Sequence, residues 1–348
     1  SPDAVFAVTF TNKAANEMRE RIRGLLGKDM KSSWIGTLHS QCSRMLRKDI
    51  NALGYGNDFS IYDEDDRCTL IRHILKEFKI YEALYKGVSS RMNLLKAALV
   101  GPEEFLSAGE GFGFDEKLAK VYVRYQDELK RSNAVDFDDL IMLTVKLLKE
   151  HPKILGRYQE QLPYVLVDEF QDLNYAQYQL VKLMAQKNKN ICAVGDDDQS
   201  IYGWRGAEVA NLLDLEKHFP EVKIVKLEQN YRSTQLILDA AHAVVSRNEA
   251  RKDKKLWTEN PRGVQIERFE ADSEDEEAEW IARQVEAEGV KRVAIVSDAI
   301  ERYEGQRHLF PPGTSFHDRH DIDAVQRELR EIAGVTALIY EQTCAAEK

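Results

Sequence analysis

The chain has 348 residues, 43% of them hydrophobic, which is enough for two domains with apolar cores, and its net charge of −10 excludes nucleic-acid binding through overall basicity. It has neither an apolar run of about 18 residues nor the basic-then-apolar opening of a signal peptide, so we expect a cytoplasmic protein with no membrane partner. Its four cysteines, which lack CxxC spacing, exclude a zinc ribbon, an iron–sulfur cluster and a disulfide scaffold.

The chain opens on a predicted core strand. Residues 5–10 have the pattern of a buried strand, and residues 11–26 have helical apolar spacing. Because no initiator Met precedes this strand, we expect a chain that is truncated upstream. From 63 to 162 the pattern is almost wholly helical, with a break near Gly101 and Pro102, which predicts an inserted helical subdomain.

Short apolar runs then alternate with helical stretches. PYVLVDEF, NICAVGDD and VKIVKLEQ each end in polar residues, the pattern of strands in a parallel α/β sheet. Ligands bind at the carboxyl ends of such strands. After Thr234 we expect a helix, a basic loop at 251–255, a strand near 264–269 and a solvated acidic helix start at 272–279.

The segment PYVLVDEFQD carries the strongest local signal. Its apolar run delivers Asp168 and Glu169 to the end of a strand. Two adjacent carboxylates at that position can hold Mg²⁺ and polarise an attacking water, as nucleotide hydrolysis requires. The alternative is an exposed acidic pair that caps the next helix, and the residues of this segment alone do not decide between the two.

The segment AVGDDDQSIYGWRGA, residues 193–207, follows another predicted strand. Gln199 could orient a water or sense a terminal phosphate. Tyr202 and Trp204 beside Arg205 could form a stacking platform for unpaired bases. Isolated aromatics are usually core residues, but aromatics interleaved with glycine and arginine in a polar segment are less easily explained by packing.

The segment KLEQNYRST, residues 226–234, is the third polar cluster after a strand. Arg232 could neutralise charge on a transferred phosphoryl group, and Tyr231 could stack on an adenine. Taken alone, a loop arginine paired with a carboxylate is the simpler explanation.

Six segments, in chain order, resemble the ordered motifs of the UvrD/Rep/PcrA family of superfamily 1 DNA helicases, and the resemblance spans residues 1 to about 288. It implies an α/β fold: a RecA-like P-loop NTPase parallel sheet with a helical inserted subdomain. The segments are AVTFTNKAANEMRERI, GTLHSQCSRMLR, NAVDFDDLI, VLVDEFQDLNYAQYQL, AVGDDDQSIYGWRGAE and LEQNYRST.

The resemblance implies roles at a nucleotide site that uses ATP and Mg²⁺. Asp168 would be the metal ligand for Mg²⁺, and Glu169 would be the base that activates water. Gln199 would couple the terminal phosphate to the DNA site. Arg232 would contact the γ-phosphate, and Tyr231 would pack on the adenine.

The resemblance also implies a track for single-stranded DNA with a base-stacking pocket. For His39 in this track, a satisfied core histidine remains the alternative. The implied DNA-binding residues are Phe10, Thr11, Asn12, Thr37, His39, Tyr202, Trp204 and Arg205.

The family pattern further implies a domain division. Residues 1–70 and 160–230 would form an incomplete first motor domain, 1A, and residues 71–159 a helical subdomain, 1B. Residues 231–288 would begin a second motor domain, 2A, and residues 289–348 would be an unrelated βαβ tail.

The chain departs from the family pattern in two respects, of which the first is the phosphate-binding motif. The family has a Gln-containing motif and a GxxxxGK[ST] loop, and neither occurs in these 348 residues. Backbone amides, the lysine and the hydroxyl of that loop hold the phosphates and magnesium. We therefore expect the chain alone to bind ATP weakly and not to hydrolyse it appreciably.

The tail, residues 289–348, departs from the family as well. Its pattern predicts a strand, a Pro-Gly loop, a helix at about 321–332 and a second strand. The stretch DAVQRELREIAGVTALIYEQTCAAEK resembles a segment of the indolepyruvate ferredoxin oxidoreductase large subunit, which implies that pieces of two unrelated proteins are joined. His317, Asp318, His320 and Asp321 have spacing that could hold a metal, but we interpret them as a polar helix start.

Three functions follow from these observations. The first is a fragment of an ATP-dependent helicase that moves 3′ to 5′ on single-stranded DNA. The second is a passive single-strand-binding remnant, and the third is a fragment of a 2-oxoacid ferredoxin oxidoreductase subunit. The sequence specifies neither a cellular pathway nor an oligomeric state.

Overall fold

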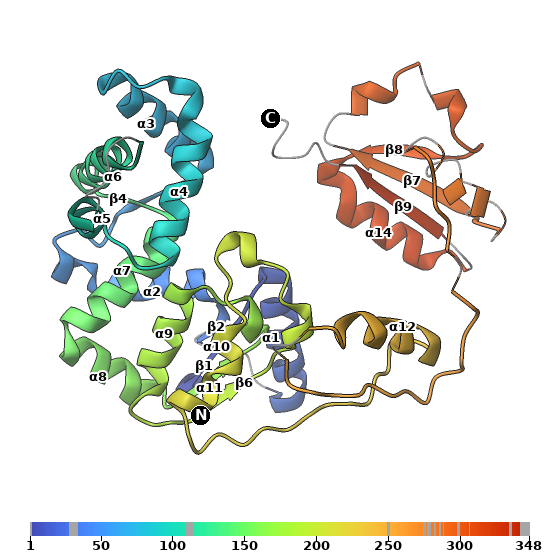
Figure 1. Ribbon diagram of the computed structural model, residues 1–348, viewed down its shortest axis with the longest axis horizontal. Coiled ribbons are helices and arrows are strands. Elements are labelled where there is room, and N and C mark those ends of the chain that lie inside the picture. The colour runs from blue at the N-terminus through green and yellow to red at the C-terminus, as the bar shows by residue number, and fades with distance from the viewer. Residues whose placement is uncertain are drawn as a thin grey trace. The chain divides into compact units, whose positions relative to one another are not determined.

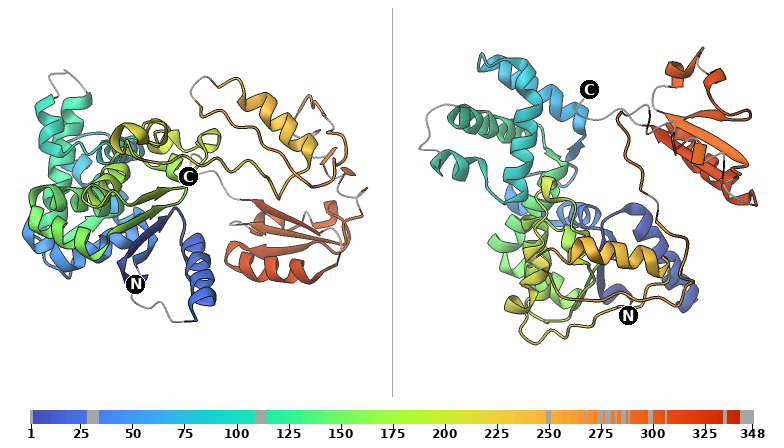
Figure 2. Two further views of the ribbon diagram at one scale, coloured as in Figure 1. Left: turned by 90° about the horizontal axis from the view of Figure 1, so that it is seen from below. Right: turned by 45° about the vertical axis from the view of Figure 1, so that its right-hand side comes forward.

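The computed structural model describes most of the chain, which forms two compact units, Ser1–Gly263 and Val264–Lys348 (Figures 1 and 2). Among the described residues, no helix is long and apolar enough to cross a membrane. The described residues are 2–27, 34–108, 114–248, 251–266, 268–273, 276, 280–281, 283–284, 287, 289–297, 300–305, 307–333 and 336–341.

The first unit is built around a four-stranded parallel sheet with the strand order β2-β1-β5-β6. The sheet residues alternate between its two faces, as the two-residue period of a strand requires. The strands are β1 (Val5–Thr9), β2 (Trp34–Thr37), β5 (Tyr164–Val167) and β6 (Ile191–Ala193).

One face of the sheet carries the main core. Phe6, Val8, Val165 and Val167 point to this face and pack with apolar side chains from several helices. The helices that supply them are α2 (Leu38–Asp49), α7 (Phe137–Glu150), α8 (Pro152–Gln161) and α9 (Tyr175–Ala185).

In the described part of the chain, the other face of the sheet is covered only in part. Helix α1 (Asn12–Leu26) packs its Met18 and Ile22 against Ala7 and Ile35. On the neighbouring strand β5, Leu166 pairs in register with Ala7 and is 39% exposed. Figure 2 shows α1 on one side of the sheet and the α2, α7 and α9 layer on the other.

The helical segment forms its own core beside the sheet. Buried residues including Ile71, Met92, Tyr122 and Tyr125 pack together there. The elements are β3 (Ser60–Tyr62), α3 (Glu64–Glu77), α4 (Tyr85–Ala97), α5 (Pro102–Ala108), α6 (Phe114–Arg131) and β4 (Ala134–Asp136), with β3 and β4 paired in parallel. Side chains of α7 and α8 pack in the main core with the four-stranded sheet instead. The proposed end of subdomain 1B at residue 159 stays a prediction.

The predicted strand over VKIVKLEQ is wrong. None of the residues 222–228 is in a strand, and only an isolated bridge joins Gln229 to Trp257. Ile224, Val225 and Leu227 are exposed. A strand requires a hydrogen-bonded neighbour, and this extended segment has no strand partner in the described part of the chain. The helices that flank it are α10 (Ala210–Leu213), α11 (Leu215–His218) and α12 (Gln235–Val245).

The predicted strand near 264–269 is likewise not formed by its described residues, and residue 267 lies outside them. The predicted acidic helix at 272–279 has Glu276 as its one described helical residue, while 274–275 and 277–279 lie outside the description.

The second unit contains the predicted tail helix and one strand more than predicted. Its parallel sheet has the order β8-β7-β9. His317 and Asp318 end strand β8, while His320 and Asp321 lie in the turn before the helix. The interpretation of these four residues as a polar helix start is therefore only partly correct. The elements are β7 (Arg292–Ser297), β8 (Ser315–Asp318), α14 (Ile322–Glu331) and β9 (Thr336–Glu341).

Candidate functional site

The acidic pair lies at the carboxyl end of β5, as predicted. The amide of Asp168 donates to the carbonyl of Val8 at 2.9 Å, which continues the parallel ladder beyond the strand. Thr9 Oγ1 donates to Asp168 Oδ2 at 3.3 Å. Glu169 has φ of 51° and ψ of 47°, a left-handed conformation that costs a non-glycine residue roughly 1–3 kcal/mol and is typical of functional sites. The chain therefore turns sharply at this position and leaves the Glu169 side chain exposed.

Gln171, which the sequence analysis did not single out, joins two parts of the site. Its side chain is buried, with Nε2 donating to Glu169 Oε2 at 2.8 Å and Oε1 accepting from the amide of Asp196 at 3.0 Å. A Cβ on Gly195 would lie 2.7 Å from Gln171 Oε1, so a side chain there would displace this amide. Gln171 thereby links the predicted base to the loop that follows β6.

A groove of about 290 Å³ runs from this strand end across the amino ends of α1 and α2. It brings together the acidic pair and five of the predicted DNA-track residues. Thr11 and Thr37 also cap the two helices, with their hydroxyls accepting from the amides of Ala14 and Ser40. The residues that line the groove are Val8, Thr9, Phe10, Thr11, Asn12, Thr37, Leu38, His39, Phe137, Val167, Asp168, Glu169, Leu173 and Gln177.

Aromatic side chains form a row that starts at the groove. Phe10 stacks on Tyr202 with ring centroids 5.1 Å apart and planes 24° apart. The ring of Tyr202 lies 6.4 Å from that of Trp204, which is 70% exposed. The predicted stacking pair is therefore at the surface next to the groove. The side chain of Arg205 lies outside the described residues.

His39 lies in the groove against an aromatic ring that was not predicted as a site residue. The rings of His39 and Phe137 stack at 3.9 Å, with 19° between their planes. Burial lowers the pKa of His39 to about 4. His39 is therefore a neutral, partly buried ring of the groove wall at pH 7. Phe137 belongs to the segment NAVDFDDLI, where an exposed aromatic among acidic residues was the available signal.

Gln199 lies in the short turn η5 (Asp197–Gln199) after β6. Its Nε2 donates to Asp196 Oδ2 at 2.6 Å. Since Asp196 is also held by Gln171, the predicted sensor and the predicted base belong to one hydrogen-bonded chain of residues. Among the described residues, however, Gln199 does not line the groove.

The predicted basic loop closes on the same turn. Lys254 Nζ pairs with Asp196, with Asp197 at 2.9 Å and with Asp198 at 3.3 Å. Arg251 Nη2 lies 2.8 Å from Asp198 Oδ2. These three carboxylates are close enough to share a cation, but each already forms an ion pair with the lysine or the arginine.

Tyr231 and Arg232 lie away from the groove lining in the described part of the chain. Tyr231 is 79% exposed and its hydroxyl donates to Gln229 Oε1 at 2.7 Å. The amide of Arg232 donates to Asn230 Oδ1 at 2.9 Å. Their roles at adenine and γ-phosphate stay predictions.

Comparison with known proteins identifies the family. The family described as UvrD/REP helicase N-terminal domain matches residues 1–220, and UvrD-like helicase C-terminal domain matches residues 225–299. The ATP-dependent DNA helicase PcrA of Bacillus subtilis (strain 168) is 40% identical over 350 residues, covering 96% of this chain and 47% of that protein. PcrA of Leuconostoc citreum is 46% identical over 288 residues, covering 82% of this chain and 38% of that protein. PcrA of Staphylococcus aureus (strain Mu50 / ATCC 700699) is 40% identical over 353 residues, covering 96% of this chain and 48% of that protein.

The chain thus spans about half the length of the curated relatives it matches, or somewhat less. Because residues 1–288 make up less than 96% of the chain, the Bacillus alignment extends into the tail. The resemblance of 289–348 to an oxidoreductase subunit is not tested by these matches and stays a prediction. With one family match covering residues 1–220 and relatives of 40–46% identity over most of its length, the chain belongs to the UvrD/REP helicase family.

Proposed function

We propose that this chain is the part of an ATP-dependent 3′-to-5′ DNA helicase that holds single-stranded DNA beside the catalytic carboxylates. The observation that carries the proposal is the shared groove, in which Phe10 and His39 line the same space as Asp168 and Glu169. A helicase must couple the state of its nucleotide to its affinity for DNA. A groove that both sets of residues line allows this coupling over a short distance.

The donor set at the end of β5 fits the Mg²⁺ that accompanies ATP. Asp168 would hold the ion, because its carboxylate faces the groove and its Oδ2 lies beside the hydroxyl of Thr9. Mg²⁺ prefers such oxygen ligands and, when bound with ATP, neutralises charge on the phosphate oxygens.

Glu169 is the proposed base for the attacking water. Its exposed carboxylate is oriented by Gln171 Nε2, which leaves the second carboxylate oxygen available to accept a proton. Gln171 also holds the amide of Asp196, and Asp196 holds Gln199. A change at the phosphate end can therefore be passed along the turn toward Tyr202 and Trp204.

The aromatic row is the proposed platform for unpaired bases. Phe10, Tyr202 and Trp204 form a row beside the groove in which Trp204 is 70% exposed, and bases stack on aromatic rings with little dependence on sequence. The chain has a net charge of −10, so the platform has to supply much of the affinity through stacking.

Fluorescence anisotropy with a labelled oligo-dT tests this function. We expect binding that weakens as salt rises, because some backbone phosphates are neutralised on binding. Unlabelled single strands should compete better than a duplex of the same length. Oligonucleotide binding that is absent at low salt would refute the proposal.

A passive single-strand-binding protein is the second candidate, and the missing GxxxxGK[ST] motif favours it for these 348 residues. Both candidates predict oligonucleotide binding. Only the motor predicts that MgATP or a non-hydrolysable analogue changes the oligonucleotide affinity in a longer chain that carries a GxxxxGK[ST] loop.

A further inference from the structure

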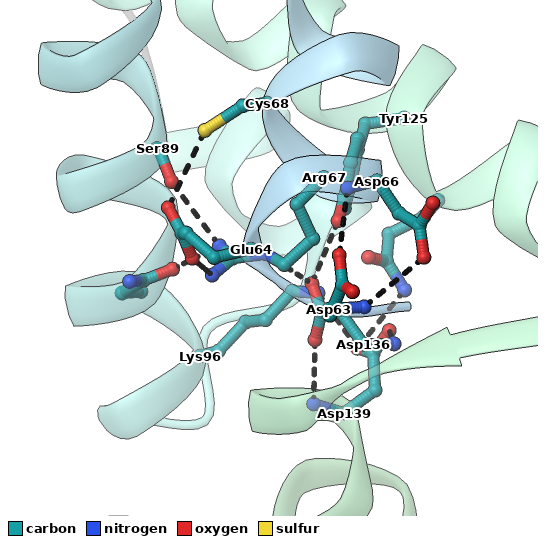
Figure 3. A network of polar contacts seen from close by, with 12 residues as sticks. Asp63, Glu64, Asp66, Arg67, Cys68, Ser89, Lys96, Tyr125, Asp136 and Asp139 are labelled. Atoms are coloured by element: carbon teal, nitrogen blue, oxygen red, sulfur yellow. Dashed lines mark hydrogen bonds and ion pairs between the residues drawn. The ribbon is translucent and has the colours of Figure 1, made fainter. Parts of the chain in front are cut away.

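A buried lysine of the helical segment contacts two aspartates at the start of α7 (Figure 3). Lys96, near the end of α4, is 1% exposed, and its Nζ lies 2.6 Å from Asp136 Oδ2 and 2.8 Å from Asp139 Oδ1. The Tyr125 hydroxyl donates to the same Asp136 oxygen at 2.9 Å, and Arg67 Nε lies 3.4 Å from it. A buried ammonium is tolerated only with such partners, and removing one partner is strongly destabilising.

The two carboxylates divide their oxygens between Lys96 and the backbone. Asp136 Oδ1 accepts from the amide of Asp139 at 2.8 Å, and Asp139 Oδ2 accepts from the amide of Asp136 at 3.2 Å. This reciprocal pair is the capping box that starts α7. The remaining oxygen of each carboxylate is the one that faces Lys96.

Phe137 is the first residue of α7 and lies between the two aspartates in sequence. Its backbone is therefore fixed on both sides by groups that Lys96 holds. Its side chain points the other way, is 52% exposed, and stacks on His39 in the groove.

We propose that Lys96 is a positioning residue for DNA binding: by anchoring Asp136 and Asp139, it holds Phe137 against His39 and so sets the width of the groove. Lys96 itself is buried and does not line the groove among the described residues, so it acts through Phe137. The inference rests on the proposed function for its DNA consequence, but its geometric claim concerns Phe137 and His39 alone.

The alternative is that Lys96 only stabilises the helical segment. Arg67 and Tyr125, from α3 and α6, meet at the same carboxylate, so a purely structural role predicts general loss of stability without a specific effect at the groove. The two roles predict different effects of a Lys96 substitution on the surroundings of His39, which lies on α2 outside the polar network of Lys96.

The experiment compares Lys96→Met with Phe137→Ala and with the double variant, each in the full 348-residue chain. Oligo-dT affinity is measured by anisotropy over a range of salt, and His39 is titrated by NMR. We expect each single variant to weaken binding roughly 5- to 150-fold, the range that loss of base–aromatic stacking gives. The double variant should be no weaker than Phe137→Ala, and the salt dependence should not change, because Lys96 touches no phosphate.

The His39 titration is independent of DNA. In the wild-type chain, the buried ring of His39 has its pKa lowered to about 4. Both single variants should raise this pKa toward 6.5, because the ring becomes solvated. A wild-type chain that binds no oligonucleotide refutes the proposed function, while the titration still decides the positioning role.

Two further variants keep the test decisive. Lys120→Met removes an exposed lysine of α6 and serves as the matched charge control. If Lys96→Met does not fold, Lys96→Met/Asp139→Asn keeps the charge balance and the cap while breaking the link to α4. A folded variant with unchanged affinity and an unchanged His39 pKa, or additive losses in the double variant, overturns the proposal.

Discussion

The ring of Phe10 stacks on the ring of Tyr202, although the two residues follow different strands of the sheet. Phe10 directly follows β1 and lines the groove, whereas Tyr202 belongs to the loop after β6. The stack fastens that loop to the groove wall, and the exposed ring of Trp204 continues the aromatic row.

Phe10→Ala and Tyr202→Ala should each weaken oligo-dT binding, because each removes a ring face and frees the loop. The expected loss is about 1–3 kcal/mol for each variant. The double variant should lose less than the sum, since the two rings are in contact. Anisotropy titrations measure the effect, and Tyr81→Ala, an exposed aromatic of the helical segment, is the control. Equal losses in the control and in the groove variants would contradict the stacking role.

Gln171→Leu should release the loop after β6 without disturbing the core. The leucine has a similar size but cannot accept from the Asp196 amide or donate to Glu169. Hydrogen exchange at the Asp196 amide should accelerate, and the free energy of unfolding should fall by about 1–3 kcal/mol because a part-buried amide loses its acceptor. Gln186→Leu, at an exposed position after α9, provides the control. An unchanged exchange rate at Asp196 would show that Gln171 does not hold the loop.

Local patterns and motif order were sufficient to place the acidic pair, the groove threonines and the stacking aromatics. Asp168 and Glu169 directly follow an apolar strand, so a short-range pattern locates them. Thr11 and Thr37 cap helices, but it was the resemblance to the family motifs that assigned them to the groove. Gln171 could not be assigned in this way, because its two partners, Glu169 and the Asp196 amide, meet only once β5 and β6 pair.

Two errors in the predicted strands also arise because strand formation depends on a partner that is distant in sequence. The strand expected over 222–229 has the right composition but no strand partner in the described part of the chain, so composition alone could not decide its state. The strand β8 (Ser315–Asp318) was missed because its residues are only half buried and include His317 and Asp318. It forms because β7 offers a free parallel edge.

The low pKa of His39 predicts a loss of stability in mild acid. Its folded pKa of about 4 is below its ordinary value of 6.5, so the unfolded chain binds more protons between these two values. Stability is thus fully present above pH 6.5 and falls as pH drops toward 4, by about 3 kcal/mol at most.

His39→Gln should abolish this contribution, which urea unfolding at pH 7 and pH 5 measures as a difference from the wild type. The variant must be compared with the wild type because two aspartates also titrate in this range. Burial raises the pKa values of Asp138 and Asp139 to about 6, so their protonation stabilises the folded chain as pH falls, whereas protonation of His39 destabilises it. His73→Gln, at an exposed histidine of α3, should leave the pH dependence as it is in the wild type. The same slope in His39→Gln and in the wild type would show that His39 is not held neutral by burial.

Lys254→Glu should detach the basic loop from the turn after β6. The variant places a carboxylate among Asp196, Asp197 and Asp198, where the wild type has an ammonium. Like charges at this distance repel, and the part-buried geometry limits screening by salt. Faster hydrogen exchange over residues 251–255 is the expected result. Lys223→Glu, at an exposed site, gives the control, and equal protection in both variants would rule out the link.

The 348-residue chain should release no phosphate from ATP above background, with or without single-stranded DNA. Asp168 and Glu169 are the proposed metal ligand and base, but the loop whose amides and lysine would anchor the phosphates is not among these residues. Without that anchor the γ-phosphate is not held in line for the attacking water, and positioning is the larger part of catalysis in phosphoryl transfer. A malachite-green assay measures the release, and Glu169→Gln defines the background. Robust DNA-stimulated turnover that Glu169→Gln abolishes would show that this chain binds the phosphates by a different set of residues.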